Sequence, residues 1–254
     1  MLKKIFSNGF TQKQKKMNKY LILSVIIFSL MSCDSENKNN TVFIQGGGTL
    51  NDWANLSKYA ESNKELIDDL DENRVVFMGN SITEGWSNFN PDFFINNPFV
   101  NRGISGQTTP QMLIRFKPDV VNLKPTAVVI LAGINDIAGN TGPMKIENIA
   151  ENIFSMAEIA LANNIEVFIC SVLPAADFPW SPGKNPAEKV IKLNSLLKDY
   201  CNKNKLTYVD YYSAMDNGKG GLKVPEHTAA DDLVHPNKAG YAVMEGVILK
   251  ALNN

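Results

Sequence analysis

The sequence predicts an α/β protein in which helices cover both faces of a parallel sheet. Two observations carry this prediction: short apolar runs typical of buried strands recur along the chain, and stretches with apolar residues at helical spacing separate them. Strands that alternate with helices are joined by crossover connections, which place consecutive strands in parallel. The chain has 254 residues, of which 44% are apolar, and this suffices for the core of one domain.

The predicted strands are short apolar runs that contain β-branched or aromatic residues, which favour the extended conformation. They occupy residues 75–78, 99–101, 127–131, 166–170 and 206–209. The first run ends at Gly79, which allows the backbone to turn sharply after the strand. We expect Ser81 to be exposed at this turn, where the strand leads into a helix.

The predicted helices are stretches with an apolar face. Residues 53–70 precede the first strand and are expected to form one or two helices. Apolar positions at helical spacing recur over residues 146–160 and again over residues 190–200. A last helix is predicted from about residue 238 to 252, because Asn237 is a suitable N-cap for it.

The N-terminus has the pattern of an export signal. Basic residues, Lys13 to Lys19, precede an apolar run over residues 20–30 that is too short for an ordinary membrane-spanning helix. The following Leu30-Met31-Ser32-Cys33 resembles a bacterial lipobox, in which Cys33 is lipidated and becomes the mature N-terminus. A non-cleaved anchor or a plain signal-peptide end are the alternatives. The lipobox predicts a lipoprotein of the bacterial cell envelope, held at a membrane by its acyl chains.

These signals divide the chain into three parts. Residues 1–33 are predicted to be the signal peptide, residues 34–48 a flexible Asn-, Ser- and Gly-rich spacer, and residues 49–254 the folded domain. The net charge of −1 and the scattered lysines give no reason to expect a nucleic-acid partner. No His/Cys cluster has metal-ligand spacing, so neither a metal nor another cofactor is expected. Cys170 and Cys201 are expected to be buried thiols.

Polar residues follow the predicted strands at the points where the strands end. The carboxyl ends of parallel strands lie at one edge of a sheet, so these residues should meet there. They comprise Ser81 after the first strand, Gly103 after the second, Asn135 after the third, Trp180 in the loop after the fourth, and Asp232 and His235 after the fifth and a long loop.

These residue types are the ones that acyl transfer to serine requires. Ser81 would be the nucleophile, His235 its base, and Asp232 the group that orients the imidazole. The backbone N–H groups of Ser81 and Gly103 and the amide of Asn135 would stabilise the oxyanion. Two alternatives remain open: Ser81 as a mere helix cap, and Trp180 as plain packing instead of a wall of the substrate pocket. His227, the only other histidine, is expected to be an exposed loop residue.

Over residues 75–239 the chain resembles the SGNH (GDSL-like) hydrolases. Four blocks carry the resemblance in the family's order: Gly79-Asn80-Ser81-Ile82-Thr83, Arg102-Gly103-Ile104-Ser105-Gly106, Gly133-Ile134-Asn135-Asp136 and Asp232-Leu233-Val234-His235-Pro236. The resemblance implies a three-layer α/β/α sandwich of the flavodoxin type with a parallel sheet of about five strands. It also implies ester or acyl hydrolysis without a metal or cofactor. One departure is that Asn80 stands where the family has Asp, so no negative charge is expected beside Ser81.

Taken together, the sequence predicts an exported serine esterase that removes a short acyl group, above all acetyl, from a small-molecule or glycan ester. The carbohydrate substrate depends on the family resemblance and on export. A lysophospholipase or thioesterase is the alternative within the hydrolases. A non-catalytic glycan-binding module and an acyltransferase that uses the same triad are the alternatives outside that class.

Overall fold

The structure, a computed structural model, describes residues 46–69, 71 and 73–253. Its strands are β1 (Val75–Gly79), β2 (Phe99–Gly103), β3 (Ala127–Leu131), β4 (Glu166–Cys170) and β5 (Thr207–Val209). They form one five-stranded sheet in the order β2-β1-β3-β4-β5, and every neighbouring pair is parallel. The predicted fold class is therefore confirmed, and each predicted strand lies within two residues of its observed bounds.

Three neighbouring strands, β2, β1 and β3, end at the same level. Gly79, the last residue of β1, pairs with Gly103 of β2 on one side and with Leu131 of β3 on the other. Every residue of β1 and β3 is buried, which explains why both strands are continuous apolar runs in the sequence. This common edge is where the loops after β1, β2 and β3 begin.

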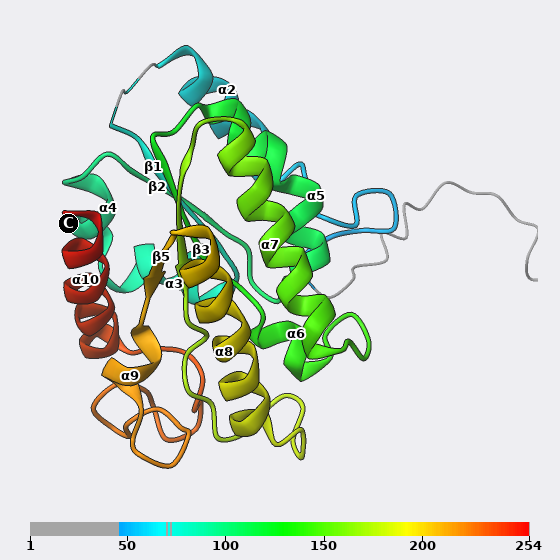
Figure 1. Ribbon diagram of the computed structural model, residues 1–254, viewed down its shortest axis with the longest axis vertical. Helices are drawn as coiled ribbons and strands as arrows, with labels where there is room; N and C mark the ends of the chain where they lie inside the picture. Colours follow the sequence, from blue (N-terminus) through cyan, green and yellow to red (C-terminus); the bar gives the residue numbers. More distant parts are fainter. Residues whose placement is uncertain (1–45, 70, 72, 254) are drawn as a thin grey trace, which may run out of the picture. The chain divides into compact units, whose positions relative to one another are not determined.

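Helices cover the sheet on both faces (Figure 1). Helices α5 (Thr109–Asp119), α7 (Ile146–Ala162) and α8 (Pro186–Asn204) pack side by side on one face. The other face is covered by α3 (Ser81–Phe89), α4 (Pro91–Ile95), α9 (Tyr211–Met215) and α10 (Lys238–Leu252). The short helix α6 (Ile134–Ala138) follows β3, and the 3₁₀ helix η1 (Val121–Leu123) follows α5. The helices predicted over residues 146–160, 190–200 and 238–252 are thus confirmed.

In the described residues ahead of β1 there is one helix, α2 (Ala60–Asp68), where one or two were predicted over residues 53–70. The helix begins late because the Asp52 carboxylate accepts hydrogen bonds from the N–H groups of Leu56 (2.7 Å) and Ser57 (2.9 Å). These bonds hold residues 53–59 in turns. The signal peptide, including Cys33, and residues 34–45 of the predicted spacer lie outside the described residues. Of the spacer glycines that are described, Gly46 and Gly48 are buried.

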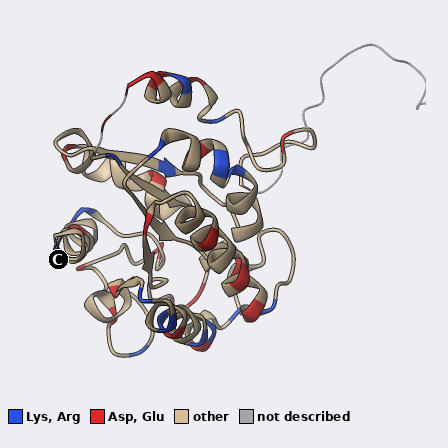
Figure 2. Ribbon diagram, turned by 45° about the horizontal axis from the view of Figure 1, so that its top comes forward, with Lys and Arg blue, Asp and Glu red and all other residues tan. Residues whose placement is uncertain are grey.

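Charged residues lie mainly on the helices and loops. Figure 2 shows acidic and basic residues interspersed along the helices, whereas the strands carry few charges. Cys170 and Cys201 are buried free thiols, as predicted. Among the helices that the structure describes, none combines the length and the apolar character that a bilayer span needs.

Candidate active site

The candidate site lies where the strand order reverses. In the strand order, β2 lies next to β1 on one side and β3 lies next to β1 on the other side, so the chain reverses its direction across the sheet after β2. Such a reversal opens a crevice beyond the carboxyl ends of the two central strands. Ser81 directly follows β1, and Asn135 lies in α6, shortly after β3. The topology therefore brings both residues to the crevice.

The turn after β1 leaves the Ser81 hydroxyl free. Asn80, not Ser81, caps α3: its side-chain oxygen accepts a hydrogen bond from the Ile82 N–H at 3.0 Å. Ser81 is the first residue of the helix, and its hydroxyl is not used by the cap. The alternative in which Ser81 serves merely as a helix cap is therefore wrong. An amide oxygen is sufficient for this capping bond, so the missing negative charge at position 80 does not disturb the turn.

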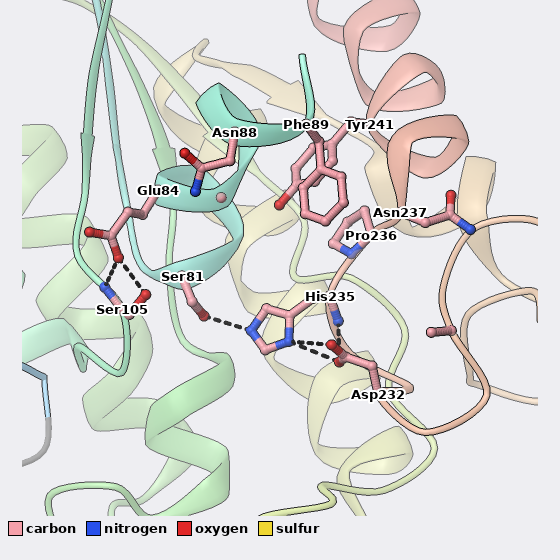
Figure 3. A pocket seen from close by; sticks show the side chains of 12 residues that line it. Ser81, Glu84, Asn88, Phe89, Ser105, Asp232, His235, Pro236, Asn237 and Tyr241 are labelled. Atoms are coloured by element: carbon pink, nitrogen blue, oxygen red, sulfur yellow. Dashed lines mark hydrogen bonds and ion pairs between the residues drawn. The ribbon is translucent and has the colours of Figure 1, made fainter. Parts of the chain in front are cut away.

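Ser81, His235 and Asp232 form a continuous hydrogen-bonded chain (Figure 3). The Oγ of Ser81 lies 2.8 Å from Nε2 of His235. The other ring nitrogen, Nδ1, lies 2.8 and 3.0 Å from the two carboxylate oxygens of Asp232. These distances match those of a serine nucleophile, its base and an orienting carboxylate.

The main chain around His235 is held as firmly as its ring. The Asp232 carboxylate also accepts the backbone N–H of His235 at 2.8 Å, and the intervening Leu233 adopts a left-handed φ of 66°. On the other side, Thr228 Oγ1 donates to the His235 carbonyl at 2.7 Å. A short i, i+3 turn thus presents the carboxylate and the imidazole together.

The other histidine is buried, and the prediction of an exposed loop residue is wrong. His227 is 9% exposed, and its carbonyl oxygen accepts the N–H of Asn237 at 2.8 Å. The reason is that the long loop folds back on itself, so that Thr228 pairs with Pro236 in an antiparallel bridge. His227 therefore supports the segment that carries His235.

Gly103 does not have the role that the sequence predicted. Its N–H donates to the side-chain oxygen of Asn101 at 2.9 Å, so this donor is already occupied. A Cβ on Gly103 would lie 2.1 Å from the backbone nitrogen of Glu84. Glycine is needed at this position because the end of β2 approaches the backbone of α3 closely. The assignment of Gly103 to the oxyanion hole is therefore corrected.

Gly106 lies three residues after Gly103, and its backbone N–H differs from that of Gly103 in having no partner in the described part of the chain. It adopts φ +77° in a tight turn, and its N–H finds no acceptor among the described residues. The carbonyl oxygen of Gly106 accepts a hydrogen bond from the side-chain amide of Asn140 at 3.0 Å. The carbonyl oxygen of the next residue, Gln107, accepts a hydrogen bond from the side-chain amide of Asn135, also at 3.0 Å. The buried amide of Asn135 is thus bound to the loop of residues 104–107, which we call the Gly106 loop. Sequence reasoning missed Gly106 because nothing in the block Gly103-Ile104-Ser105-Gly106 distinguishes the packed glycine from the free one.

Two charged groups hold the Gly106 loop. Glu84, on α3, accepts hydrogen bonds from the N–H (2.8 Å) and the hydroxyl of Ser105, and pairs with Lys58 at 3.0 Å. Burial opposes the ionisation of Glu84, but these hydrogen bonds outweigh it and hold the pKa of this carboxyl below its usual value. The second charged group is Arg115, which is fully buried. Its guanidinium donates hydrogen bonds to the side-chain oxygen of Gln107 at 2.5 Å and to the carbonyl oxygen of Gly79 at 2.9 Å. Arg115 thereby joins the end of β1 to the Gly106 loop.

Asp136 follows Asn135, and its carboxylate is bound at the start of α5. Its carboxylate accepts the backbone N–H of Thr109 at 3.0 Å and the Thr109 hydroxyl at 2.6 Å, at the start of α5. Burial raises the pKa of Asp136 to about 6, although the bonds from Thr109 act in the opposite direction. This carboxyl is therefore a structural group that ties α6 to α5.

Trp180 lies beside His235. Its ring centroid is 6.0 Å from that of His235, and its indole N–H donates to the Asn140 side chain at 3.3 Å. The residue is 42% exposed. Trp180 thus borders the site on the side of His235, where a substrate group can reach it.

A cavity of about 540 Å³ opens above Ser81 and His235. Its lining is mixed: Glu84 and Asn88 are polar, whereas Phe89 and Tyr241 are aromatic (Figure 3). No Lys or Arg of the described chain lines this cavity. Within the same residues, no three His, Cys, Asp or Glu side chains gather in a way that could hold a metal ion.

The sequence is similar to known hydrolases. The sequence model of the GDSL-like lipase/acylhydrolase family matches residues 77–243, more than half of the chain. A Bacteroides fragilis protein of known structure, with a provisional acylhydrolase assignment, is 48% identical, with a TM-score of 0.74; the match covers 80% of this chain and 97% of that one. A GDSL-like lipase from Bacteroides thetaiotaomicron is 45% identical, with a TM-score of 0.73, over 79% of this chain and 98% of that one.

More distant structures share the fold. The acetyl xylan esterase AlAXEase is 17% identical, with a TM-score of 0.57, over 70% of this chain and 99% of that one. No curated protein sequence matches the chain.

Proposed function

Because the chain belongs to the GDSL-like lipase/acylhydrolase family and is thus a carboxylic ester hydrolase, we propose that it removes short acyl groups, above all acetyl, from carbohydrates. The single observation that carries the mechanism is the hydrogen-bonded chain from Ser81 Oγ through His235 to Asp232. A serine hydroxyl needs such a base to attack an ester at neutral pH, and the base needs an orienting partner.

The proposed reaction proceeds through an acyl-enzyme. Ser81 Oγ attacks the ester carbonyl while Nε2 of His235 takes its proton, and Asp232 stabilises the resulting imidazolium. His235 returns the proton to the alkoxide as the C–O bond breaks, which frees the alcohol and leaves the acyl group on Ser81. A water molecule then attacks the acyl-enzyme with His235 as base, and this step releases the carboxylic acid.

The proposed oxyanion donors are the backbone N–H groups of Ser81 and Gly106 and the side-chain amide of Asn135. The Ser81 N–H lies at the N-terminus of α3 and is one of the donors that a helix leaves unpaired. The hydrogen bond from Asn135 to the carbonyl next to Gly106 supports a common location for the last two donors. Three donors that are fixed before the reaction stabilise the tetrahedral intermediate without reorganisation.

The charges that line the cavity support a substrate whose leaving group is a neutral, polar alcohol. Glu84 and Asp232 supply negative charge to its lining, and no Lys or Arg of the described residues lines it. A lysophospholipid would bring a phosphate, for which binding sites ordinarily provide cationic groups. This lining favours an acylated sugar over the phospholipid alternative. An acetyl xylan esterase with the same fold is consistent with that class of substrate.

The test is hydrolysis of p-nitrophenyl esters from acetyl to dodecanoyl by a soluble chain beginning at residue 46, with Ser81→Ala and Asp232→Asn in parallel. We expect rapid turnover of the short esters. Ser81→Ala should lower kcat by a factor of about 10⁴ or more, and Asp232→Asn should leave a residual rate. Unchanged melting temperatures will show that both variants fold. Wild-type rates in Ser81→Ala would overturn the mechanism, and a preference for dodecanoyl esters would overturn the substrate class.

We also propose that the enzyme is exported and held at a membrane of the cell envelope through a lipid on Cys33. The basic flank, the short apolar run and the tetrapeptide ending at Cys33 support this proposal. In a bacterial host, radiolabelled palmitate should be incorporated into the full chain. Incorporation that persists in Cys33→Ala would refute the assignment.

A further inference from the structure

One wall of the cavity above Ser81 is a column of aromatic rings that ends in solvent. Phe89, at the end of α3, is 47% exposed although it is a large apolar residue. Its ring lies on that of Tyr241, with the centroids 5.4 Å apart and the planes at 29°. Tyr241 in turn packs on Trp86, at 5.5 Å and 30°. The outer ring therefore has one face covered by protein and one face available to a ligand.

The column is rigid where it backs the cavity. Tyr241 is 1% exposed, and its hydroxyl donates to the Ile82 carbonyl at 2.8 Å. Trp86 stacks on Phe93 with nearly parallel planes, and its indole N–H donates to Glu245 at 2.9 Å. A ligand that stacks on Phe89 thus meets a surface fixed in advance, which lowers the entropy lost on binding.

The wall across the cavity is polar. Figure 3 shows the aromatic pair on one side and Glu84 with Ser105 on the other, with Ser81 and His235 between them. Asn88, next to Phe89, is exposed, and its side-chain amide has no hydrogen-bond partner in the described part of the chain. An apolar face opposite carboxylate and amide groups matches a sugar ring, which has C–H groups on its faces and hydroxyls around its edge.

The cavity lies on the side of the leaving alcohol. His235 lines it, and this residue must return its proton to the departing oxygen. Gly106 and Asn135, which lie where the acyl oxygen would be stabilised, do not line it. This lining favours the alcohol part of the ester over the acyl chain as the group that fills the cavity.

We propose that Phe89 is the stacking platform of a leaving-group subsite, which selects esters of neutral pyranose sugars. This inference rests on the proposed function, because it assigns the alcohol part of the substrate to the same site. The carboxylates of Glu84 and Asp232 favour a neutral ring over an anionic one. Phe89 thus acts in specificity and not in the chemical step.

The test compares an O-acetylated methyl xylopyranoside with ethyl acetate, which has the same acyl group and no ring. The quantity measured is the ratio of kcat/KM for the two esters. Phe89→Ala should lower this ratio about tenfold, the range of a lost stacking contact, and Phe89→Tyr should restore it. Ile95→Ala is the matched control, because it trims an exposed apolar side chain of α4 outside the cavity and should leave the ratio unchanged.

Two results would overturn the inference. One is an unchanged ratio in Phe89→Ala. The other is a larger loss on ethyl hexanoate than on the xyloside, which would mean that Phe89 contacts the acyl chain. Both results leave turnover dependent on Ser81. Failure of the proposed function itself has a different signature: Ser81→Ala would hydrolyse the acetyl esters as fast as the wild-type protein.

Discussion

At the scale of single residues, hydrogen-bond partners decide the roles. Gly103 and Gly106 belong to one short sequence block, yet the N–H of the first is bound to Asn101, whereas that of the second has no acceptor within the described part of the chain. The sequence predicted that Ser81, His235 and Asp232 lie together, because residues that follow parallel strands meet at one edge of the sheet, and the structure joins the three by hydrogen bonds. The sequence did not separate the two glycines, because the Asn101 side chain, which occupies the Gly103 N–H, is itself bound to Thr83 and Ser87 of α3, far away in the sequence.

The oxyanion assignment can be tested at Asn135. In Asn135→Ala we expect kcat to fall by about 10²–10³ with little change in KM, because the lost donor acts on charge that develops in the transition state. Asn163→Ala, which makes the same truncation at the exposed end of α7, is the control. Steady-state kinetics on p-nitrophenyl acetate will measure both. A rise in KM with an unchanged kcat would assign Asn135 to substrate binding instead.

The raised pKa of Asp136, to about 6, makes a prediction about stability. Between its unfolded pKa near 4 and its folded pKa near 6, the folded state binds more proton than the unfolded state. The contribution of Asp136 to stability therefore falls as the pH rises through this window and is level above it.

Relative to Asp136→Asn, the wild-type protein should accordingly be more stable at pH 4 than at pH 7, by up to about 3 kcal/mol. Urea unfolding of the two proteins at pH 4, 5, 6 and 7 gives this difference, in which the other titrating groups cancel. A difference that does not vary with pH would show that the pKa of Asp136 is the same in the folded and unfolded states.

At the scale of elements, the sequence predicted the strands and long helices whose buried residues are mainly apolar, and it did not predict α5, many of whose buried residues are polar. The strands are buried on both faces and therefore stand out as apolar runs. Helix α5 was not predicted, because many of its buried positions are polar: Thr109, Gln111, Arg115 and Asp119 leave no clear apolar stripe. Its start was nevertheless encoded, by the capping box of Thr108 and Gln111 with Pro110 in the first turn.

The cap of α3 should matter for both stability and catalysis. Asn80→Ala removes the bond to the Ile82 N–H and should cost about 1 kcal/mol. Because Ser81 is the next residue, kcat should fall as well. Asp210→Ala is the matched control, since Asp210 caps α9 through the Ser213 N–H at 3.0 Å. It should lower stability by a similar amount without lowering kcat. Equal kcat values in the two variants would show that the cap does not position the nucleophile.

At the scale of the whole molecule, a buried polar network connects the segment ahead of β1 to the site. Arg115 pairs with Asp119 at 2.9 Å, and Asp119 accepts from Asn63 of α2 at 2.7 Å. The Tyr59 hydroxyl donates to the Gly103 carbonyl, and Arg102 lies 4.5 Å from the Tyr59 ring centroid. Sequence alone could not predict this network, because its members are far apart in the chain and individually resemble surface residues.

The centre of this network is expected to be sensitive to truncation. Arg115→Met leaves the buried Asp119 carboxylate without its cation and should destabilise the protein by about 3–5 kcal/mol. Lys192→Met breaks the exposed pair with Glu147 and should cost far less, because solvent screens that pair. Urea denaturation will measure both, and removal of Asp119 as well, in Arg115→Met/Asp119→Leu, should recover part of the loss. Similar costs for the two single variants would contradict a dominant role for the network.

The distance along the chain between Ser81 and His235, the proposed nucleophile and base, has a consequence for when activity can begin. Ser81 and His235 are 154 positions apart, and α10, which follows the base, anchors to α3 through Tyr241 and Glu245. A ribosome completes the nucleophile turn long before it delivers the base. The growing chain therefore has no means of attacking esters until synthesis is nearly finished. Hydrolysis is thus expected to begin when the last helix packs against α3. The release of a dye from an ester can therefore be used to measure the time of this final folding step.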